Sequence, residues 1–245
     1  MRGSVNCASG EAAHRSVRAP CSRLLASRSV DTGEPASLYC GGSRGAGHRS
    51  EALDLTHMAA YLEEVASVLR AIPAADLDAI ADRLWEAYHE RAHIFACGNG
   101  GSSATASHFV EDLSKGIEVQ AGRPRFRAIS LVDSVAILTA YGNDVGFEHI
   151  FSEPLRNLVC ARDVLIAVSC SGRSANVIRA MEVARQAGAT VIAWTGRDGG
   201  DMKALADICL VVPSQSMQQI EDAHLVVAHA VYLDLKHRVE KGTAA

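Results

Sequence analysis

Residues 163–188 read DVLIAVSCSGRSANVIRAMEVARQAG and contain three successive patterns. An apolar run covers 163–169, a serine-rich loop follows it, and 174–187 repeats apolar residues at spacings of three and four before a glycine. A short apolar run is typical of a buried strand, and the later spacing is typical of a helix that ends at glycine. The stretch therefore predicts a strand, a loop and a helix, the repeating unit of α/β folds.

The same alternation continues on both sides of this stretch. Further strand-like runs lie at 93–97, 126–131, 190–195 and 208–212. Helical patterns lie at 102–115, 134–141, 147–159, 202–206 and 218–240, and two amphipathic helices interrupted at Pro73 precede the first strand. The strands are apolar throughout rather than at every second residue, which indicates a parallel sheet covered on both faces. We expect a doubly wound α/β domain over 56–245, with a five-stranded parallel sheet behind an N-terminal helical pair.

The first 55 residues have a different composition. Residues 1–50 contain seven arginines, no lysine and three acids, and they show no helical or alternating apolar period. Such a segment cannot bury enough apolar surface to offset its ordering entropy. We expect a disordered or non-native extension over 1–55. An organellar transit peptide is the alternative, and Met58 could be the natural start.

Composition excludes several classes of protein. Of 245 residues, 48% are hydrophobic and 21% are charged, and the formal net charge is −4. No apolar run approaches the roughly 20 residues of a membrane-spanning helix, and the charge balance gives no basic patch for direct contact with nucleic acid. Seven cysteines without a C-x-x-C pair favour reduced thiols in a cytoplasmic protein. We expect the thiols of Cys97, Cys160, Cys170 and Cys209 to be buried.

The loop after the first predicted strand, 98–103, reads GNGGSS. Glycines let the backbone approach a ligand, and the free N–H groups at the start of the next helix favour an anion. The alternative is a tight turn in which Ser102 caps the helix. The loop lacks the lysine of a P-loop and the spacing of a dinucleotide fingerprint, so it supports neither function.

The loop after the third predicted strand is more specific. Ser169, Ser171 and Ser174 surround a glycine where a helix begins. Hydroxyl and backbone donors at a helix N-terminus can hold a phosphate without a lysine or a metal. A plain helix cap by Ser174 is the alternative, but it accounts for one serine and not for three.

Together with 195–200, which read TGRDGG, these loops resemble those of the sugar isomerase (SIS) domain family and, within it, the phosphoheptose isomerase branch. The resemblance covers about residues 58–241. It implies a five-stranded parallel sheet, a homotetramer with active sites at subunit interfaces, and isomerisation of sedoheptulose 7-phosphate in heptose biosynthesis. It also implies a set of substrate-binding residues: Asn99, Gly100, Gly101, Ser102, Asp144, Ser169, Ser171 and Ser174.

The resemblance further implies a divalent metal, zinc, held by His108, Asp112, Glu221 and His229. His108 and Asp112 are one helical turn apart and face the same way, as two ligands of one ion must. Glu221 and His229 are eight residues apart, about 12 Å along one helix, which is too far for one ion without help from fraying or a neighbouring subunit. Glu221 is therefore the weakest of the four expected ligands.

An aldose–ketose isomerase needs a carboxylate base, a second group that moves the proton on oxygen, and a means to polarise the carbonyl. Asp112 as base, His229 as acid/base and the metal would supply all three, with Glu111 as the alternative base. The family commonly has glutamate at 112, glutamine at 221 and Thr-Gly-Arg at 114–116, where this chain has Asp, Glu and Ser-Lys-Gly.

Two alternatives remain at this stage. His224 and His229 could be packed or solvent-tipped helix histidines instead of functional groups. The chain could also be a phosphosugar-binding regulator of the replication-initiator-associating type, without catalysis. In such proteins the metal and acid/base residues tend to be missing, whereas His108, Asp112 and His229 are competent groups, which favours an enzyme.

Overall fold

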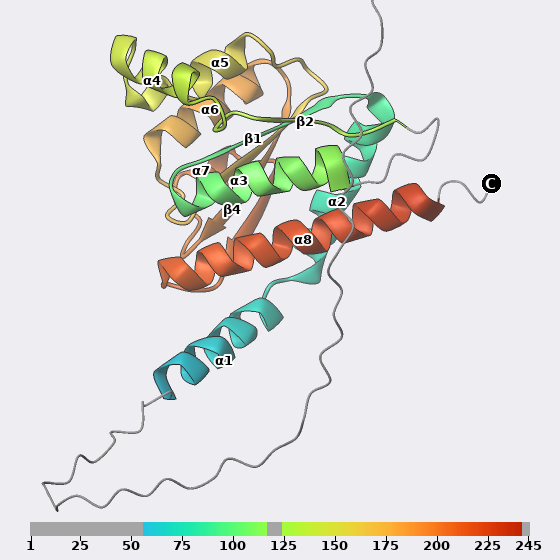
Figure 1. Cartoon of the computed structure of the whole chain (residues 1–245), viewed down its shortest axis with the longest axis vertical. Coiled ribbons are helices and arrows are strands. Elements are labelled where there is room, and N and C mark those ends of the chain that lie inside the picture. Colours follow the sequence, from blue (N-terminus) through green and yellow to red (C-terminus); the bar gives the residue numbers. More distant parts are fainter. Residues whose placement is uncertain (1–55, 117–123, 242–245) are drawn as a thin grey trace, which may run out of the picture. The chain divides into compact units, whose positions relative to one another are not determined.

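The computed structural model describes residues 56–116 and 124–241. The expectation for 1–55 lies outside the described residues. The sheet has five strands: β1 (His93–Gly98), β2 (Arg127–Ser130), β3 (Val164–Ser169), β4 (Thr190–Gly196) and β5 (Ile208–Val212). Their order is β2-β1-β3-β4-β5 and every pairing is parallel. Figure 1 shows the ribbon of the chain, with β1, β2 and β4 labelled. The predicted five-stranded parallel sheet is confirmed.

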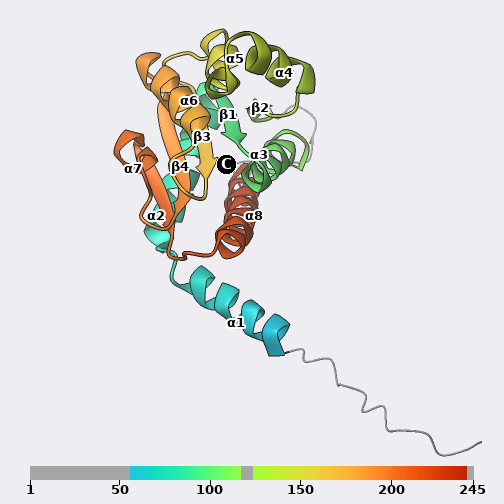
Figure 2. The ribbon, with the colours of Figure 1, turned by 90° about the vertical axis from the view of Figure 1, so that its left-hand side faces the viewer.

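Helices cover both faces of the sheet (Figure 2). On one face α2 (Ala74–Glu90), α3 (Gly101–Glu111) and α8 (Met217–Lys241) pack on Ile94, Ile166 and their neighbours. On the other face of the sheet, α5 (Ser152–Arg156), α6 (Ala175–Gln186) and α7 (Met202–Leu205) pack on Phe95, Leu165 and the residues around them. Because successive residues of a strand point to opposite faces, strands buried on both sides must be apolar at every position.

Two predicted helices differ from the structure. The span 147–159 is not continuous: a 3₁₀ turn, η2 (Phe147–His149), precedes α5. Pro154 lies in the first turn of α5, where its missing N–H costs nothing, so the helix cannot extend far upstream of it. The span 102–115 ends as α3 at Glu111 and continues as a π turn, η1 (Asp112–Gly116). α4 (Val135–Asp144) lies beside η2 and contains no buried residue.

The first helix, α1 (Thr56–Arg70), contacts α8. Val68 and Leu69 pack against Ile220 and Ala223, and Gln219 Nε2 donates to Glu64 Oε2 at 2.8 Å. The Tyr61 hydroxyl donates to Asp222, and this bond raises the pKa of Tyr61 to about 12. α1 thus contacts the part of α8 that adjoins the carboxyl ends of the strands.

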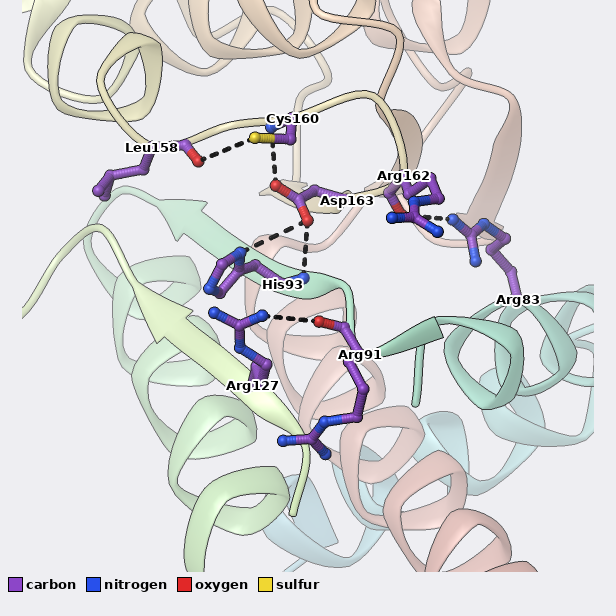
Figure 3. A network of polar contacts seen from close by, with 8 residues as sticks. All are labelled: Arg83, Arg91, His93, Arg127, Leu158, Cys160, Arg162 and Asp163. Carbon is purple, nitrogen blue, oxygen red and sulfur yellow. Dashed lines mark hydrogen bonds and ion pairs between the residues drawn. The ribbon is translucent and has the colours of Figure 1, made fainter. Parts of the chain in front are cut away.

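A polar network fixes the opposite, amino end of the sheet (Figure 3). The Asp163 carboxylate, 3% exposed, accepts hydrogen bonds from the backbone N–H groups of His93 and Cys160, each at 2.7 Å. It therefore joins the start of β1 to the turn before β3. Arg83 extends the network by donating to the Arg162 carbonyl at 2.9 Å and to Thr190 Oγ1 at 2.9 Å.

The four described cysteines are free thiols. Cys97 and Cys170 are buried as expected, and Cys209 is half-buried. The prediction for Cys160 is wrong: it lies in the turn before β3 rather than in a strand, and its side chain is exposed. Among the described helices, none is long and apolar enough to cross a membrane.

Candidate active site

The strand order creates a crevice at the carboxyl ends of β1 and β3. The chain passes from β1 to β2 on one side and from β3 to β4 on the other, so the loops after these adjacent strands diverge. Such a switch point is where open α/β sheets bind ligands. A hollow of about 220 Å³ lies there. Its lining is Asn99, Ser102, Val168, Ser169, Cys170, Ser171, Ser174, Arg197, Met217 and Glu221.

The three predicted serines converge in this hollow. Ser169 Oγ lies 3.0 Å from Ser174 Oγ and 3.5 Å from Ser171 Oγ. Ser174 occupies the N-cap position of α6, but its side chain makes no capping hydrogen bond. The hydroxyl points to Ser169 instead. The cap interpretation therefore does not account for this side chain, and the three hydroxyls form one cluster of donors.

The loop after β1 forms the other wall. Gly100 is the N-cap of α3 with φ +55°, a left-handed conformation that favours glycine. A Cβ atom at Gly101 would lie 2.4 Å from the Glu221 carboxylate, so a larger residue there would displace the end of that flexible side chain. Ser102 is buried and its Oγ lies 3.9 Å from Cys170 Sγ. Ser102 is not the cap that the alternative interpretation required.

Asn99 and Asn176 join the two loops. Each side-chain amide donates to the other, and both hydrogen bonds are 2.8 Å long. Asn176 is 2% exposed, on the first turn of α6. We did not predict Asn176, because nothing in its spacing separates it from an ordinary helix residue. Its partnership with Asn99 arises only when β1 and β3 become neighbours.

Farther along α3 and α8, His108, Asp112 and His229 come together. The two Nε2 atoms are 3.2 Å apart, and Asp112 Oδ2 lies 3.7 Å from that of His108 and 3.9 Å from that of His229. Asp112 Oδ2 is buried and has no hydrogen-bond partner. One ligand atom from each residue lies within 4.8 Å of the others. His108 and Asp112 are one helical turn apart, and both lie beside His229, which follows His108 by 121 residues.

This arrangement fits a divalent cation. Two imidazole nitrogens bound to one tetrahedral zinc ion would be about 3.3 Å apart, given Zn–N bonds of 2.0–2.1 Å. A cation between them would also engage the partnerless carboxylate oxygen of Asp112. Two imidazoles and one carboxylate are a common ligand set for zinc at catalytic sites, where a further position stays open.

Two predicted site residues lie elsewhere. Glu221 lines the serine hollow, with its Oε1 4.0 Å from Cys170 Sγ, and is not in the histidine cluster. Asp144 is exposed at the end of α4 and lines a different hollow, with Tyr141 and Val145. Within one copy of the chain, neither residue joins the group that was predicted for it.

The two histidines of α8 differ in their surroundings. His229 is exposed and faces His108, whereas His224 is fully buried. His224 Nε2 donates to the Thr195 carbonyl at 3.1 Å, which fixes the neutral tautomer. Burial lowers the pKa of His224 to about 4. The packed interpretation therefore fits His224, whose hydrogen bond anchors α8 to the end of β4, whereas His229 is solvent-exposed at its tip and lies beside His108 and Asp112.

The comparisons agree with this fold. A family model described as the SIS domain matches residues 60–196. The phosphoheptose isomerase of Trichlorobacter lovleyi is 42% identical over 157 residues, which are 64% of this chain and 78% of that protein. The phosphoheptose isomerase of Neisseria gonorrhoeae is 43% identical over 141 residues, which are 56% of this chain and 71% of that protein. A solved structure of phosphoheptose isomerase from Neisseria gonorrhoeae has a TM-score of 0.69 at 34% identity, covering 74% of this chain and 98% of that one.

The chain therefore belongs to the SIS-domain family. Within that family it falls among the phosphoheptose isomerases, so it is an enzyme, a sugar-phosphate isomerase. More distant structures share only the fold. The NanR protein of Vibrio vulnificus, solved in complex with ManNAc-6P, is 18% identical with a TM-score of 0.53.

Proposed function

We propose that this enzyme is a metal-dependent aldose–ketose isomerase that converts sedoheptulose 7-phosphate to a heptose 7-phosphate. The observation that carries the proposal is the placement of the two groups of residues along α3 and α8. Gly101 and Glu221 meet beside the serine hollow, and His108 and His229 meet farther along the same two helices. One ligand can therefore reach both groups.

The separation suits a long sugar. Seven residues separate Gly101 from His108, which is about 10 Å along a helix. From carbon 2 to the phosphorus of a 7-phosphate there are seven bonds of about 1.5 Å, an extended span of about 9 Å. A pentulose 5-phosphate would span about 6 Å by the same measure. A seven-carbon ketose thus comes closer to this axial rise than a pentulose does.

His108, Asp112 and His229 would hold the divalent ion, which we propose to be zinc. Such an ion supplies Lewis acidity toward the sugar oxygens when it is bound. Glu221 would complete the set only from a neighbouring copy of the chain, because it lies about 12 Å along α8 from His229. We propose the homotetramer with interfacial active sites on this ground and on the family resemblance.

The chain's own groups then divide the remaining chemistry. Ser169, Ser171 and Ser174 hold the phosphate and so fix the reacting carbons. Asp112 takes the proton from the carbon next to the carbonyl and returns it to the adjacent carbon. His229 moves the proton between the two sugar oxygens. Asn99 and Asn176 keep the two loops in register.

The enzyme is the better candidate than a binding regulator. The relatives at 42% and 43% identity are isomerases, and all three residues of the histidine cluster are chemically competent. We also propose a cytoplasmic location, consistent with the free thiols of the four described cysteines.

Metal content and turnover test the proposal. Elemental analysis of the isolated wild-type protein should find about one divalent ion per chain, and chelation should abolish conversion of sedoheptulose 7-phosphate. His108→Ala should lose both metal and turnover. His237→Ala, which changes an exposed histidine on the same α8, is the matched control and should keep both. A metal-free wild type with full turnover would overturn the proposal.

A further inference from the structure

Two arginines lie on the loops that surround the serine hollow, and they differ in what they contact. Arg173 is committed to other groups. Its guanidinium forms a two-point ion pair with Asp198, at 2.7 and 3.1 Å, and also donates to the Ser171 carbonyl at 3.1 Å. It is not part of the lining of the hollow.

Arg197 differs from Arg173 in both its position and its contacts. It lines the hollow together with the serines, and none of the ion pairs within 56–116 and 124–241 includes it. The pKa of the Cys170 thiol is raised by burial, and the charge of Arg197 opposes that rise. The guanidinium therefore acts on the hollow and forms no ion pair with a carboxylate of the described residues.

The backbone conformation of Arg197 also indicates a functional side chain. Its φ is +58°, and among the described non-glycine residues only Arg91 shares a positive φ. The loop has glycines at 196, 199 and 200, and the Arg197 N–H donates to the Ser214 carbonyl at 3.1 Å. Glycine would adopt this conformation without strain. Strain of this kind tends to persist where a side chain has a function.

We infer that Arg197 is a phosphate-binding residue, whose guanidinium donates charge-assisted hydrogen bonds to the phosphoryl group in the serine hollow. The inference rests on the proposed function for the identity of the ligand. It revises the uncharged cradle expected from the sequence, since the hollow holds one cation and one carboxylate, Glu221. The cation offsets the repulsion that Glu221 would exert on a phosphate dianion.

Calorimetry with inorganic phosphate and with sedoheptulose 7-phosphate tests the inference. Arg197→Gln and Arg197→Gly should each weaken binding of both probes by about 10- to 100-fold, the value of a hydrogen bond to a charged group. Arg197→Lys should recover much of the loss. Arg173→Gln is the matched control and should change affinity by less than about threefold, because Arg173 is already paired with Asp198 and does not line the hollow, although both arginines are exposed.

The glycine variant separates binding from folding. Arg197→Gly relieves the backbone strain, so its melting temperature should equal or exceed that of wild type while its affinity falls. If Arg197 were merely structural, Arg197→Gly would retain affinity. That result would overturn the inference, and so would equal losses in Arg173→Gln and Arg197→Gln.

A Glu221→Gln background tests the remaining rival, in which Arg197 only neutralises Glu221. Arg197→Gln should still weaken phosphate binding there, and no effect would overturn the inference. Failure of the proposed function gives another result: wild type would bind inorganic phosphate through Arg197 but not sedoheptulose 7-phosphate. A wild type that binds neither probe would overturn both.

Discussion

Asp112 and Glu111 are adjacent acids in different surroundings. Asp112 is largely buried with Oδ2 facing two histidines, whereas Glu111 is exposed and pairs with Lys115 at 3.4 Å. We expect Asp112→Asn to slow turnover of sedoheptulose 7-phosphate by about 100-fold or more, the usual value of a positioned general base. Glu111→Gln should leave the rate nearly unchanged. Steady-state assays of both variants decide between the two acids, and a loss confined to Glu111→Gln would reverse our assignment.

His224 predicts a pH dependence of stability. Burial lowers its pKa from 6.5 to about 4, so between those values the unfolded chain binds a proton that the folded chain does not. The free energy of unfolding should therefore be highest above about pH 6.5 and fall as the pH drops toward 4, by up to about 3 kcal/mol from this group.

His224→Gln keeps an N–H donor for the Thr195 carbonyl but does not titrate. Denaturant unfolding at several pH values across the window should show a shallower decline in the variant than in wild type. Identical slopes would mean that His224 does not set the acid sensitivity.

At the scale of single residues, the sequence predicts which side chains can bind a ligand better than it predicts which residues they contact. The serines, His108 and Asp112 are recognisable because each group lies within one turn or one loop. Asn176 and Arg197 are not, because their roles depend on neighbours that the fold brings from other strands. The same holds for Glu221, whose place in the hollow depends on how α8 crosses Gly101.

The serine loop is the element on which substrate binding depends. Ser171→Ala with Ser174→Ala removes two hydroxyls of the cluster, so affinity for sedoheptulose 7-phosphate should drop by about 100-fold or more at roughly 1.5–3 kcal/mol for each bond to a charged acceptor. The fold should persist, since neither hydroxyl caps α6.

A matched control for that double variant lies on α4. Ser134 accepts a capping bond from the Ile137 N–H at 3.4 Å and lies outside the hollow. Ser134→Ala should cost about 1 kcal/mol of stability and leave affinity unchanged. Unchanged binding by the double variant in calorimetry would move the phosphate to the loop after β1.

Periodicity predicts the long elements and fails at the irregular ones. All five strands and α6 appear close to their expected bounds, because buried apolar runs and a terminal glycine mark them. The π turn after α3 and the break before α5 were missed. In both, local hydrogen bonding departs from the helical pattern while the spacing of apolar residues continues, so the period alone cannot reveal the change.

At the scale of the whole molecule, residues 1–55 offer no amphipathic pattern with which to dock on the domain. Their deletion should leave the melting temperature, the oligomer size and turnover unchanged. Differential scanning calorimetry and analytical ultracentrifugation on the truncated and full chains provide the comparison. A large loss of stability or a smaller oligomer would show that the segment packs on the rest.

The proposed homotetramer requires an interface, and the exposed apolar surface of α4 and η2 is the candidate for it. Large apolar side chains are exposed along α4 and η2, with Val135 71%, Ile137 45% and Phe147 65% exposed. A single copy gains nothing from exposing them, so a partner surface is the simplest reason for their presence.

Val135→Asp with Phe147→Asp should therefore reduce the oligomer to a smaller species in ultracentrifugation, with little loss of the monomer's own stability because neither side chain is buried. Leu158→Asp, at an exposed apolar residue outside α4 and η2, is the control and should preserve the assembly. If the active sites lie at interfaces, turnover should fall together with oligomer size while the serine hollow still binds phosphate. A double variant that stays tetrameric would exclude this face from the interface, and a monomer with full turnover would show that one chain carries the whole site.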